Sequence, residues 1–504
     1  MKLLVYLCLL CTTSAYRILV ITPVPSKSHH NLGKGIVRSL LKANHKVFWV
    51  TPFPENGVQG LTIVDVSSIT QEIKSLDVTG KSWSEVNHLM RSVSLATLRH
   101  AAVLRVMEKQ FDAVVTEWYM ADLEAGYAAI QQAPWILLST LAMHPQLEKL
   151  VDTVRSVSTL PLLITDYDVP MSFTERFVNT LTYWVLHVKN MKELCANEAL
   201  YEANFGPLAA ARCVELPPFY SALHNVSILL VNSHPTVSTA QSLPPNVVEI
   251  GGYHIDEDDP ALPEDLQHIL DLAPQGAILF SLGSIVNATS LLKSVKHELI
   301  DLFGSLPYTF LWKFDEEFDR LPKNVHVRKW MPQNSILAHP NTKVFISHCG
   351  LLSTLESLYF GVPVLAAPVF GDQHRNAADA VKSGRALRVD LKNVTLVQAA
   401  LKEITENKTY FVRTKYLSKL YRARPVSPSR LVSFYVELAI ETKGAFHLRS
   451  KALLYSWYEI QNLDVMAAVL LILLMVFFSC KTTYKLLYWC CRRKTEDSYE
   501  KKVK

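Results

Sequence analysis

The fold is decided by the stretch Trp330–Gln373, which reads WMPQNSILAHPNTKVFISHCGLLSTLESLYFGVPVLAAPVFGDQ. Within it, Val344–Ile346 is a short apolar run of β-forming residues, and Ser347–Gly350 follows as a turn. Leu351–Tyr359 then has helical spacing. The stretch therefore predicts a strand, a tight glycine turn and the N-terminus of a helix.

A junction of this kind suits a phosphate group. It points backbone N–H groups and the positive end of a helix dipole outward. Gly361–Pro363 ends the helix, Val364–Leu365 begins a second buried strand, and Pro368–Gln373 forms the loop after it. Two strand ends then face one crevice, which is where open α/β sheets usually bind ligands. We therefore expect a ligand that carries phosphate.

The first half of the chain alternates strands and helices. Arg17–Thr22 predicts a strand, Leu32–Ala43 a helix and Lys46–Thr51 a second strand, which together make a βαβ opening. The loop Pro23–His30 lacks a glycine-rich dinucleotide fingerprint, so this half is not expected to bind a nucleotide. The alternation continues with a helix, a strand, a helix and a strand at Leu95–Gln110, Phe111–Glu117, Asp122–Ile130 and Pro134–Ser139.

The boundary between two domains is predicted in the Pro- and Ser-rich stretch Ser233–Pro245, a natural linker. Before it, the apolar region Leu147–Phe219 either shapes a lipophilic pocket or packs as plain core, and Met171–Ala203 within it has a helical pattern. The second half opens with Val247–Gly251. Its further strands are expected at Ala277–Ser281, Phe310–Phe314, Val325–Lys329, Val344–Ile346, Val364–Ala367 and Ala386–Val389. The sequence thus predicts two Rossmann-like domains, residues 16–240 and 241–440, that face each other across a cleft.

Both ends of the chain carry targeting patterns. Residues 1–15 combine a lysine, an apolar run and small residues, which is the layout of a cleaved secretory signal. Val465–Cys480 is an apolar run that, with its neighbours, approaches the length of a bilayer span, and we predict a transmembrane helix at residues 463–480. Arg492–Lys494 follow it, so the tail, residues 481–504, is expected in the cytoplasm. We predict a single-pass type I membrane protein whose bulk is lumenal, with residues 441–462 leading to the membrane.

The last residues indicate a compartment. Lys501 and Lys502 stand fourth and third from the end, which resembles the dilysine retrieval signal of endoplasmic reticulum membrane proteins; a solvated charge run is the alternative. Four Asn-x-Ser/Thr sequons lie on the side predicted to be lumenal, at Asn225, Asn287, Asn393 and Asn407.

Composition excludes several classes of protein. With 504 residues and 49% hydrophobic content the chain can bury large cores, and its net charge of +5 without a basic stripe gives no sign of nucleic-acid binding. Cys195 and Cys213 could pair, although their spacing does not support it, and no cysteine or histidine cluster has metal-ligand spacing. Association of the chain with copies of itself stays open.

The stretch also closely resembles the nucleotide-sugar signature of the UDP-glycosyltransferases, which join a sugar from a UDP-sugar to small lipophilic acceptors. The resemblance is carried by residues in one collinear pattern: Trp330, Pro332, Gln333, His348, Gly350, Glu356, Gly361, Pro363, Asp372 and Gln373. It implies the α/β architecture called GT-B, with two facing Rossmann-like domains and a C-terminal transmembrane helix. It also implies that the last helices cross back onto the first domain.

The resemblance assigns roles in binding the donor. Trp330 and Gln333 would contact the uracil and Glu356 the ribose hydroxyls, while Asp372 and Gln373 would hold the sugar. The diphosphate would be held by side chains and backbone N–H groups at Ser284, His348, Gly350, Ser353 and Thr354. Many relatives carry asparagine where Leu352 stands, so one phosphate contact is lost or is replaced by Ser353 or Thr354.

Transfer also needs a base that deprotonates the acceptor hydroxyl, and an acid that orients the base. In the resembled family the base is the histidine of a Ser-His pair after the first strand, which corresponds to Ser28-His29; His30 is the alternative. The family's orienting acid is an aspartate, and Glu117 stands at its place. Because glutamate has a longer side chain, Asp122 remains a second candidate.

We expect no metal and no cofactor besides the UDP-sugar. Asp166-Tyr-Asp168 and Asp256-Glu-Asp258 match the metal-binding Asp-x-Asp of the other glycosyltransferase fold, GT-A, but both are predicted in loops far from the signature. Resemblance to insect-type members, which share the Ser-His-His loop and the His-x-Gly-Leu-Leu-Ser-Thr run, favours UDP-glucose as the donor. The rival interpretation is a non-catalytic carrier of lipophilic ligands on the same scaffold, which the departures at Glu117 and Leu352 keep open.

Overall fold

The computed structural model describes residues 15–503 except for residues 56, 74–82, 121, 152–156, 163–164, 166, 168, 238–239, 256–260, 284–287 and 317. The chain divides into a large unit that ends at Arg449 and a second unit that begins at Ser450. The expected signal segment, residues 1–15, lies outside the described residues except for its last position.

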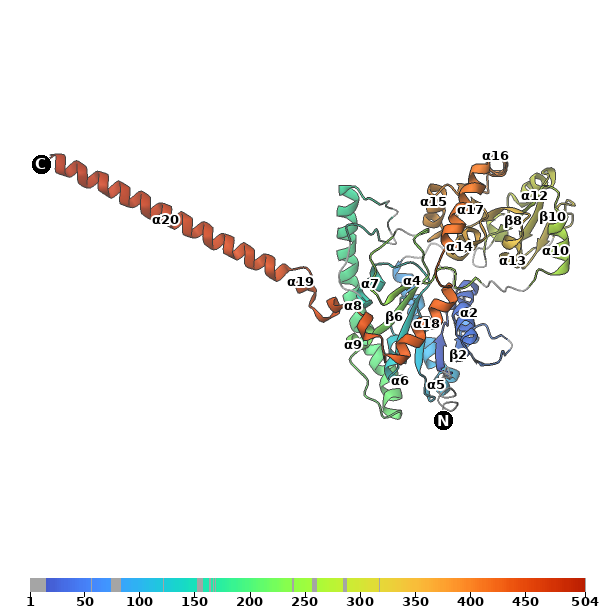
Figure 1. Cartoon of the computed structure of the whole chain (residues 1–504), viewed down its shortest axis with the longest axis horizontal. Coiled ribbons are helices and arrows are strands. Elements are labelled where there is room, and N and C mark those ends of the chain that lie inside the picture. Colours follow the sequence, from blue (N-terminus) through green and yellow to red (C-terminus); the bar gives the residue numbers. More distant parts are fainter. Residues whose placement is uncertain are drawn as a thin grey trace, which may run out of the picture. The chain divides into compact units, whose positions relative to one another are not determined.

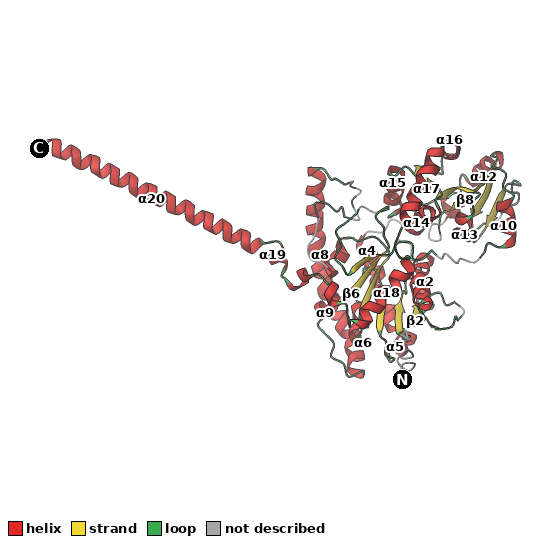
Figure 2. Cartoon of the chain, viewed as in Figure 1, coloured by secondary structure: helices red, strands yellow, loops and turns green. Residues whose placement is uncertain are grey.

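The large unit contains two sheets whose strands all run parallel (Figures 1 and 2). The first sheet has the order β3-β2-β1-β4-β5-β6-β7. Its strands are β1 (Arg17–Ile21), β2 (Lys46–Thr51), β3 (Leu61–Asp65), β4 (Ala113–Trp118), β5 (Trp135–Ser139), β6 (Val226–Val231) and β7 (Val247–Glu249). The helices of this half are α2 (Lys27–Lys42), α3 (Ile69–Glu72), α4 (Trp83–Arg99), α5 (Ala101–Met107), α6 (Ala125–Gln131), α7 (Pro145–Val151), α8 (Phe173–Ala211) and α9 (Phe219–Leu223).

The second sheet has the order β10-β9-β8-β11-β12-β13. Its strands are β8 (Ala277–Ser281), β9 (Thr309–Lys313), β10 (Val325–Arg328), β11 (Thr342–Ser347), β12 (Val364–Ala366) and β13 (Ala386–Arg388). The helices that follow β7 in the large unit are α10 (Glu264–Asp271), α11 (Ala288–Leu291), α12 (Lys296–Ser305), α13 (Gln333–Ala338), α14 (Leu351–Phe360), α15 (Gln373–Lys382), α16 (Val394–Glu406), α17 (Lys408–Arg422) and α18 (Pro428–Glu441).

Both faces of the first sheet are buried, which is why its strands read as unbroken apolar runs. Alternate residues of β1 enter different cores: Ile18 and Val20 pack on one side, and Leu19 and Ile21 on the other. Helix α18 covers the first of these cores and lies beside α2 (Figure 1). The last long helix of the large unit thus crosses back onto the first sheet, as the resemblance implied.

Two elements differ from the sequence expectation in ways that matter for the site. Helix α2 begins at Lys27 rather than near Leu32, because Ser26 adopts the extended N-cap conformation ahead of it. His29 therefore lies in the first turn of a helix and not in a loop. Strand β7 pairs with β6 in the first sheet, although we expected Val247–Gly251 to open the second domain. The chain thus crosses between the halves only after this strand.

The expected helix Leu95–Gln110 is interrupted. α4 ends at Arg99, and α5 begins at Ala101 because the His100 side chain accepts a hydrogen bond from the N–H of Ala102 and caps a new helix. Cys195 and Cys213, whose pairing the sequence left open, are both free thiols.

Helix α8 has two kinds of surface within the region Leu147–Phe219. Near its C-terminus, Tyr201 and Phe205 are fully buried in the core of the first half. Its first turns instead expose apolar side chains: Phe173, Phe177, Val178, Leu181, Trp184, Val185 and Val188. Plain core packing, one of the two alternatives for this region, therefore accounts for only the C-terminal part of the helix.

The second unit contains α19 (Trp457–Ile460) and the long helix α20 (Leu463–Val503). Leu463–Trp489 within α20 is 27 residues long, has a mean hydropathy of 2.6 and buries none of its most apolar window. It is the one helix among the described residues that is long and apolar enough to span a membrane. It includes the segment 463–480 that the sequence indicated and extends beyond it.

Candidate active site

The parallel register of β1 and β4 brings together two residues that are far apart in the sequence. Ile21 pairs with Thr116, so the carboxyl ends of the two strands are neighbours. His29 follows β1 in the first turn of α2, and Glu117 is the next-to-last residue of β4. Nδ1 of His29 is hydrogen-bonded to Oε1 of Glu117. The structure thus pairs the histidine and the glutamate that the sequence offered as base and orienting acid.

This pairing determines the tautomer of the His29 ring. A carboxylate accepts hydrogen bonds and does not donate them, so Nδ1 carries the hydrogen and Nε2 is the basic nitrogen. Burial disfavours the charged ring, but the charge and hydrogen bond of Glu117 and the charge of Asp372 outweigh it and raise the pKa of His29 above 6.5. The side chain is 29% exposed, whereas that of Glu117 is fully buried. The geometry is that of a general base oriented by an acid.

The two alternatives that the sequence left open lie in other surroundings. His30 is buried, with Nδ1 3.2 Å from Thr51 Oγ1, Nε2 3.0 Å from Glu55 Oε1, and its ring stacked on Trp49. Both of its ring nitrogens are therefore engaged in holding the first half together.

Asp122 is likewise engaged elsewhere. It accepts a hydrogen bond of 3.0 Å from Trp118 Nε1 and forms an ion pair of 3.3 Å with Lys149. Its φ of 58° places it in the left-handed region, at a turn between β4 and α6. The structure therefore brings Glu117 to His29, and it places Asp122 with Trp118 and Lys149.

The second half contributes the predicted strand, turn and helix. β11 ends at Ser347, Gly350 is the N-cap of α14, and Cys349 between them has a φ of 60°. A Cβ atom at Gly283 or Gly350 would approach His348 Nε2 to 2.6 or 2.5 Å, so the imidazole packs against both glycines, and the φ of 78° at Gly283 also favours glycine there. Burial and then the charge of Lys313 lower the pKa of His348 to about 4. The imidazole is therefore neutral near pH 7 and can still donate a hydrogen bond.

Lys313 is a cation that the sequence reasoning missed. It ends β9, its Nζ donates a hydrogen bond of 2.6 Å to the carbonyl of Gly283, and it lies 5.7 Å from the centre of the Trp330 ring. Burial lowers its pKa, against the opposing charge of Asp315. The signal was present in the sequence, since Lys313 is the next-to-last residue of the predicted strand Phe310–Phe314.

The residues expected around a uridine lie just before α13, in α13 and in α14. Trp330 is 57% exposed, and Lys27 of the first half lies 5.7 Å from the centre of its ring. Gln333 Nε2 donates to Ser353 Oγ at 3.1 Å and also to Oε2 of Glu356. Glu356 is buried in α14, and its other oxygen is 3.5 Å from His254 Nε2.

The expected phosphate contacts at the start of α14 differ in their surroundings. Ser353 and Thr354 are both buried, and the Ser353 hydroxyl already accepts the amide of Gln333. Leu352 packs against the apolar core that lies between the first sheet and α2. The residue that departs from the family pattern therefore makes an apolar contact between the halves. Ser284 lies outside the described residues.

Asp372 and Gln373 follow β12. Asp372 Oδ2 accepts a hydrogen bond of 2.8 Å from Asn376, and desolvation by the surrounding protein raises the pKa of Asp372, although the charge of His29 opposes this. The charges of His29 and Asp372 thus affect each other's pKa, although the two residues belong to different halves. Gln373 is buried, and its Oε1 accepts the N–H groups of Val369 and Phe370. Only its amide nitrogen is left to contact a ligand.

No group of three or more His, Cys, Asp or Glu side chains among the described residues is arranged to hold a metal ion. Asp166, Asp168 and Asp256–Asp258 lie outside the described residues.

The fold matches solved glycosyltransferases of the GT-B type. Spinosyn forosaminyltransferase SpnP covers 85% of this chain and all of its own length with a TM-score of 0.58 at 18% identity. A UDP-glucosyltransferase from Polygonum tinctorium, solved with 3,4-dichloroaniline, covers 86% of this chain and 99% of its own with a TM-score of 0.55 at 17% identity. These likenesses show the fold, which is the GT-B architecture that the sequence resemblance implied.

Sequence comparison shows the family. UDP-glucosyltransferase 2 of Dactylopius coccus is 31% identical over 95% of both chains, and mouse UDP-glucuronosyltransferase 1A9 is 28% identical over 97% of this chain and 95% of its own. Residues 41–498 match the family model described as UDP-glucoronosyl and UDP-glucosyl transferase. A chain with this fold and this match over most of its length belongs to the UDP-glycosyltransferase family.

Proposed function

We propose that this protein transfers glucose from UDP-glucose to a hydroxyl of a small lipophilic acceptor, with inversion at the anomeric carbon and with His29 as the general base. The single observation that carries the proposal is the pair of His29 and Glu117, which faces Asp372 from the opposite half. Such a pair at the edge of a UDP-sugar site has the parts that acceptor activation needs.

The acceptor oxygen attacks the anomeric carbon, its proton passes to Nε2 of His29, and the bond from the anomeric carbon to the diphosphate oxygen breaks. Glu117 stabilises the imidazolium that forms. The charge that develops on UDP meets the N-terminus of α14 and the ammonium of Lys313. Asp372 and the amide of Gln373 orient the sugar.

The choice of sugar rests on the relatives. The relative from Dactylopius coccus is named a UDP-glucosyltransferase, whereas the mouse relative is named a UDP-glucuronosyltransferase. Release of UDP from UDP-glucose, UDP-glucuronate and UDP-galactose, each with a panel of phenols and sterols, tests donor and acceptor together. We expect release with UDP-glucose and at least one acceptor. Binding of acceptors without UDP release from any donor would instead support the carrier interpretation.

Lys313 is expected to bind the diphosphate. The Lys313→Gln variant should bind UDP roughly tenfold or more weakly, because a hydrogen bond to a charged group is lost. Uridine, which has no phosphate, should bind the variant and the wild-type protein equally. Lys313→Arg keeps the charge and should retain most of the affinity. Calorimetric titration measures all three, and unchanged UDP affinity in Lys313→Gln would remove this residue from the site.

Turnover is expected to be insensitive to metal removal, because helix dipoles and Lys313 supply the positive field that the leaving group needs. Initial rates should be the same before and after EDTA treatment. A rate that falls with EDTA and returns with added Mg²⁺ or Mn²⁺ would contradict the proposed step.

We also propose that the protein is anchored in the endoplasmic reticulum membrane by Leu463–Trp489, with the large unit lumenal. The apolar helix and the lysines at the end of the tail support this placement. Protease added to sealed microsomes should remove only the tail. Digestion of the large unit without detergent would show that this unit lies on the cytoplasmic side of the membrane.

A further inference from the structure

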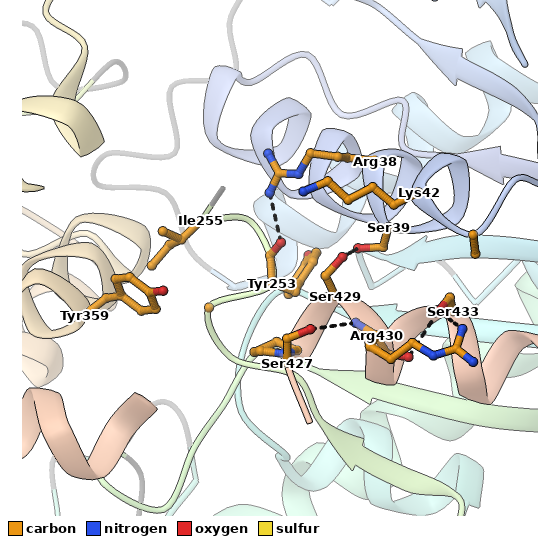
Figure 3. A pocket seen from close by; sticks show the side chains of 13 residues that line it. Arg38, Ser39, Lys42, Tyr253, Ile255, Tyr359, Ser427, Ser429, Arg430 and Ser433 are labelled. Atoms are coloured by element: carbon orange, nitrogen blue, oxygen red, sulfur yellow. Dashed lines mark hydrogen bonds between the residues drawn. The ribbon is translucent and has the colours of Figure 1, made fainter. Parts of the chain in front are cut away.

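The segment that leaves the first sheet after β7 is held tightly against α2. A side chain at Gly35 would approach the Cα atom of His254 to 2.8 Å, so the two backbones are in close contact. Arg38 Nη2 donates hydrogen bonds of 3.2 Å to the carbonyls of Tyr253 and His254, the first of which Figure 3 shows. The backbone at His254 is therefore fixed to the first half of the protein.

The side chain of His254 reaches the second half. Its Nε2 lies 3.5 Å from Oε1 of Glu356 in α14, and the two side chains are only 2% and 8% exposed. Within the described part of the chain, neither ring nitrogen of His254 forms a hydrogen bond. A buried ring of this kind is costly unless a polar partner or a ligand engages it. The Glu356 carboxylate is an acceptor within 3.5 Å of its Nε2.

The two oxygens of Glu356 are approached from different halves. Oε2 accepts the amide of Gln333, which belongs to the second half, whereas Oε1 faces His254 from the first. A carboxylate that receives one donor on each oxygen is fixed in rotation, and its remaining lone pairs then point in defined directions. Gln333 already donates to Oε2, and Nε2 of His254, 3.5 Å from Oε1, is placed to donate to the second oxygen.

We propose that His254 is a positioning residue for the donor site: its Nε2–H orients Glu356 so that the carboxylate accepts hydrogen bonds from the ribose hydroxyls. The inference rests on the proposed UDP-sugar site. It concerns a residue that neither the signature nor the His29 and Glu117 pair contains. It also ties recognition of the ribose to the arrangement of the two halves, since the backbone of His254 belongs to one half and Glu356 to the other.

The test compares UDP with 2′,3′-dideoxy-UDP, which lacks both ribose hydroxyls, on the full-length protein in detergent. We expect the wild-type protein to prefer UDP by about tenfold or more, because hydrogen bonds to a charged group are lost with the analogue. His254→Leu should bind UDP more weakly and prefer it by less than about threefold, while its affinity for the analogue stays near that of wild type. A purely structural role would weaken both ligands equally and leave the preference intact.

A matched pair of amides covers the case in which His254→Leu fails to fold. In His254→Gln the amide nitrogen is as many bonds from Cβ as Nε2 is in histidine, whereas in His254→Asn it is one bond closer. Gln should therefore retain the preference for UDP, and Asn should lose it. Equal preferences in Gln and Asn would overturn the inference.

Glu356→Gln separates this inference from the proposed function. If His254 acts through Glu356, His254→Leu should cause no further loss of preference in the Glu356→Gln background. If the wild-type protein bound UDP and 2′,3′-dideoxy-UDP equally well, both the proposed role of Glu356 and the inference about His254 would be wrong. A wild-type preference that His254→Leu fully retains would overturn the inference alone.

Discussion

Replacing His29 with alanine is expected to lower kcat by about 10²- to 10⁴-fold, which is the usual contribution of a positioned general base. The affinity for UDP should not change, because the residues expected to hold it lie in the second half. Initial rates of UDP release give kcat, and calorimetric titration gives the UDP affinity. The combination of lost turnover and retained binding is what a missing base produces.

His30 provides the control for this prediction, because it is the neighbouring histidine and was the alternative base. Its ring nitrogens contact Thr51 and Glu55, and its ring stacks on Trp49. His30→Gln should therefore reduce thermal stability more than turnover. If His29→Ala kept wild-type turnover, or if a folded His30→Gln variant lost turnover instead, the base would have to be reassigned.

Replacing Glu117 with glutamine is the second prediction with a large effect. The neutral amide removes the charge that stabilises the imidazolium, so kcat should fall by roughly 10²- to 10⁴-fold. The pH dependence should change as well. Burial lowers the pKa of His29, and Glu117 is the main group that raises it. Without that carboxylate the pKa falls, His29 stays unprotonated at lower pH, and the acid limb of the kcat/KM profile should move to lower pH.

Two further variants make this prediction specific. Glu117→Asp keeps the charge on a shorter side chain, so its kcat should fall less than that of Glu117→Gln and its acid limb should stay closer to wild type. Asp122→Asn removes the other candidate acid, which contacts Trp118 and Lys149, and should leave the acid limb unchanged. An acid limb that moved in Asp122→Asn but not in Glu117→Gln would assign the orienting role to Asp122.

Much of the second half could be predicted from the sequence because its local signals agree with its tertiary structure. The strand Ala277–Ser281 was predicted with its observed bounds, and the helix from Leu351 was one residue short at its end. Apolar runs ended by glycine define such elements without help from distant residues. The start of the helix after β1 was less predictable. Ser26 and the polar residues that follow it are typical of a loop, whereas in the structure Ser26 is the N-cap and the helix begins at Lys27.

The sequence by itself determined the family and the fold. Trp330–Gln373 carries a collinear pattern whose residues must keep their order and spacing to surround one ligand. Order and spacing can be read directly from the amino-acid sequence. It also placed His29 and Glu117 as candidates, although only by resemblance.

Only the tertiary structure decided which side chains meet. Glu117 rather than Asp122 reaches His29 because the register of β1 and β4 places it there. Leu352 packs between the halves, and His254 approaches Glu356 although it precedes it by 102 residues in the sequence. No local sequence pattern predicts such contacts, because they depend on how the two sheets pack against each other. That packing is determined by surfaces whose residues are spread over the whole chain.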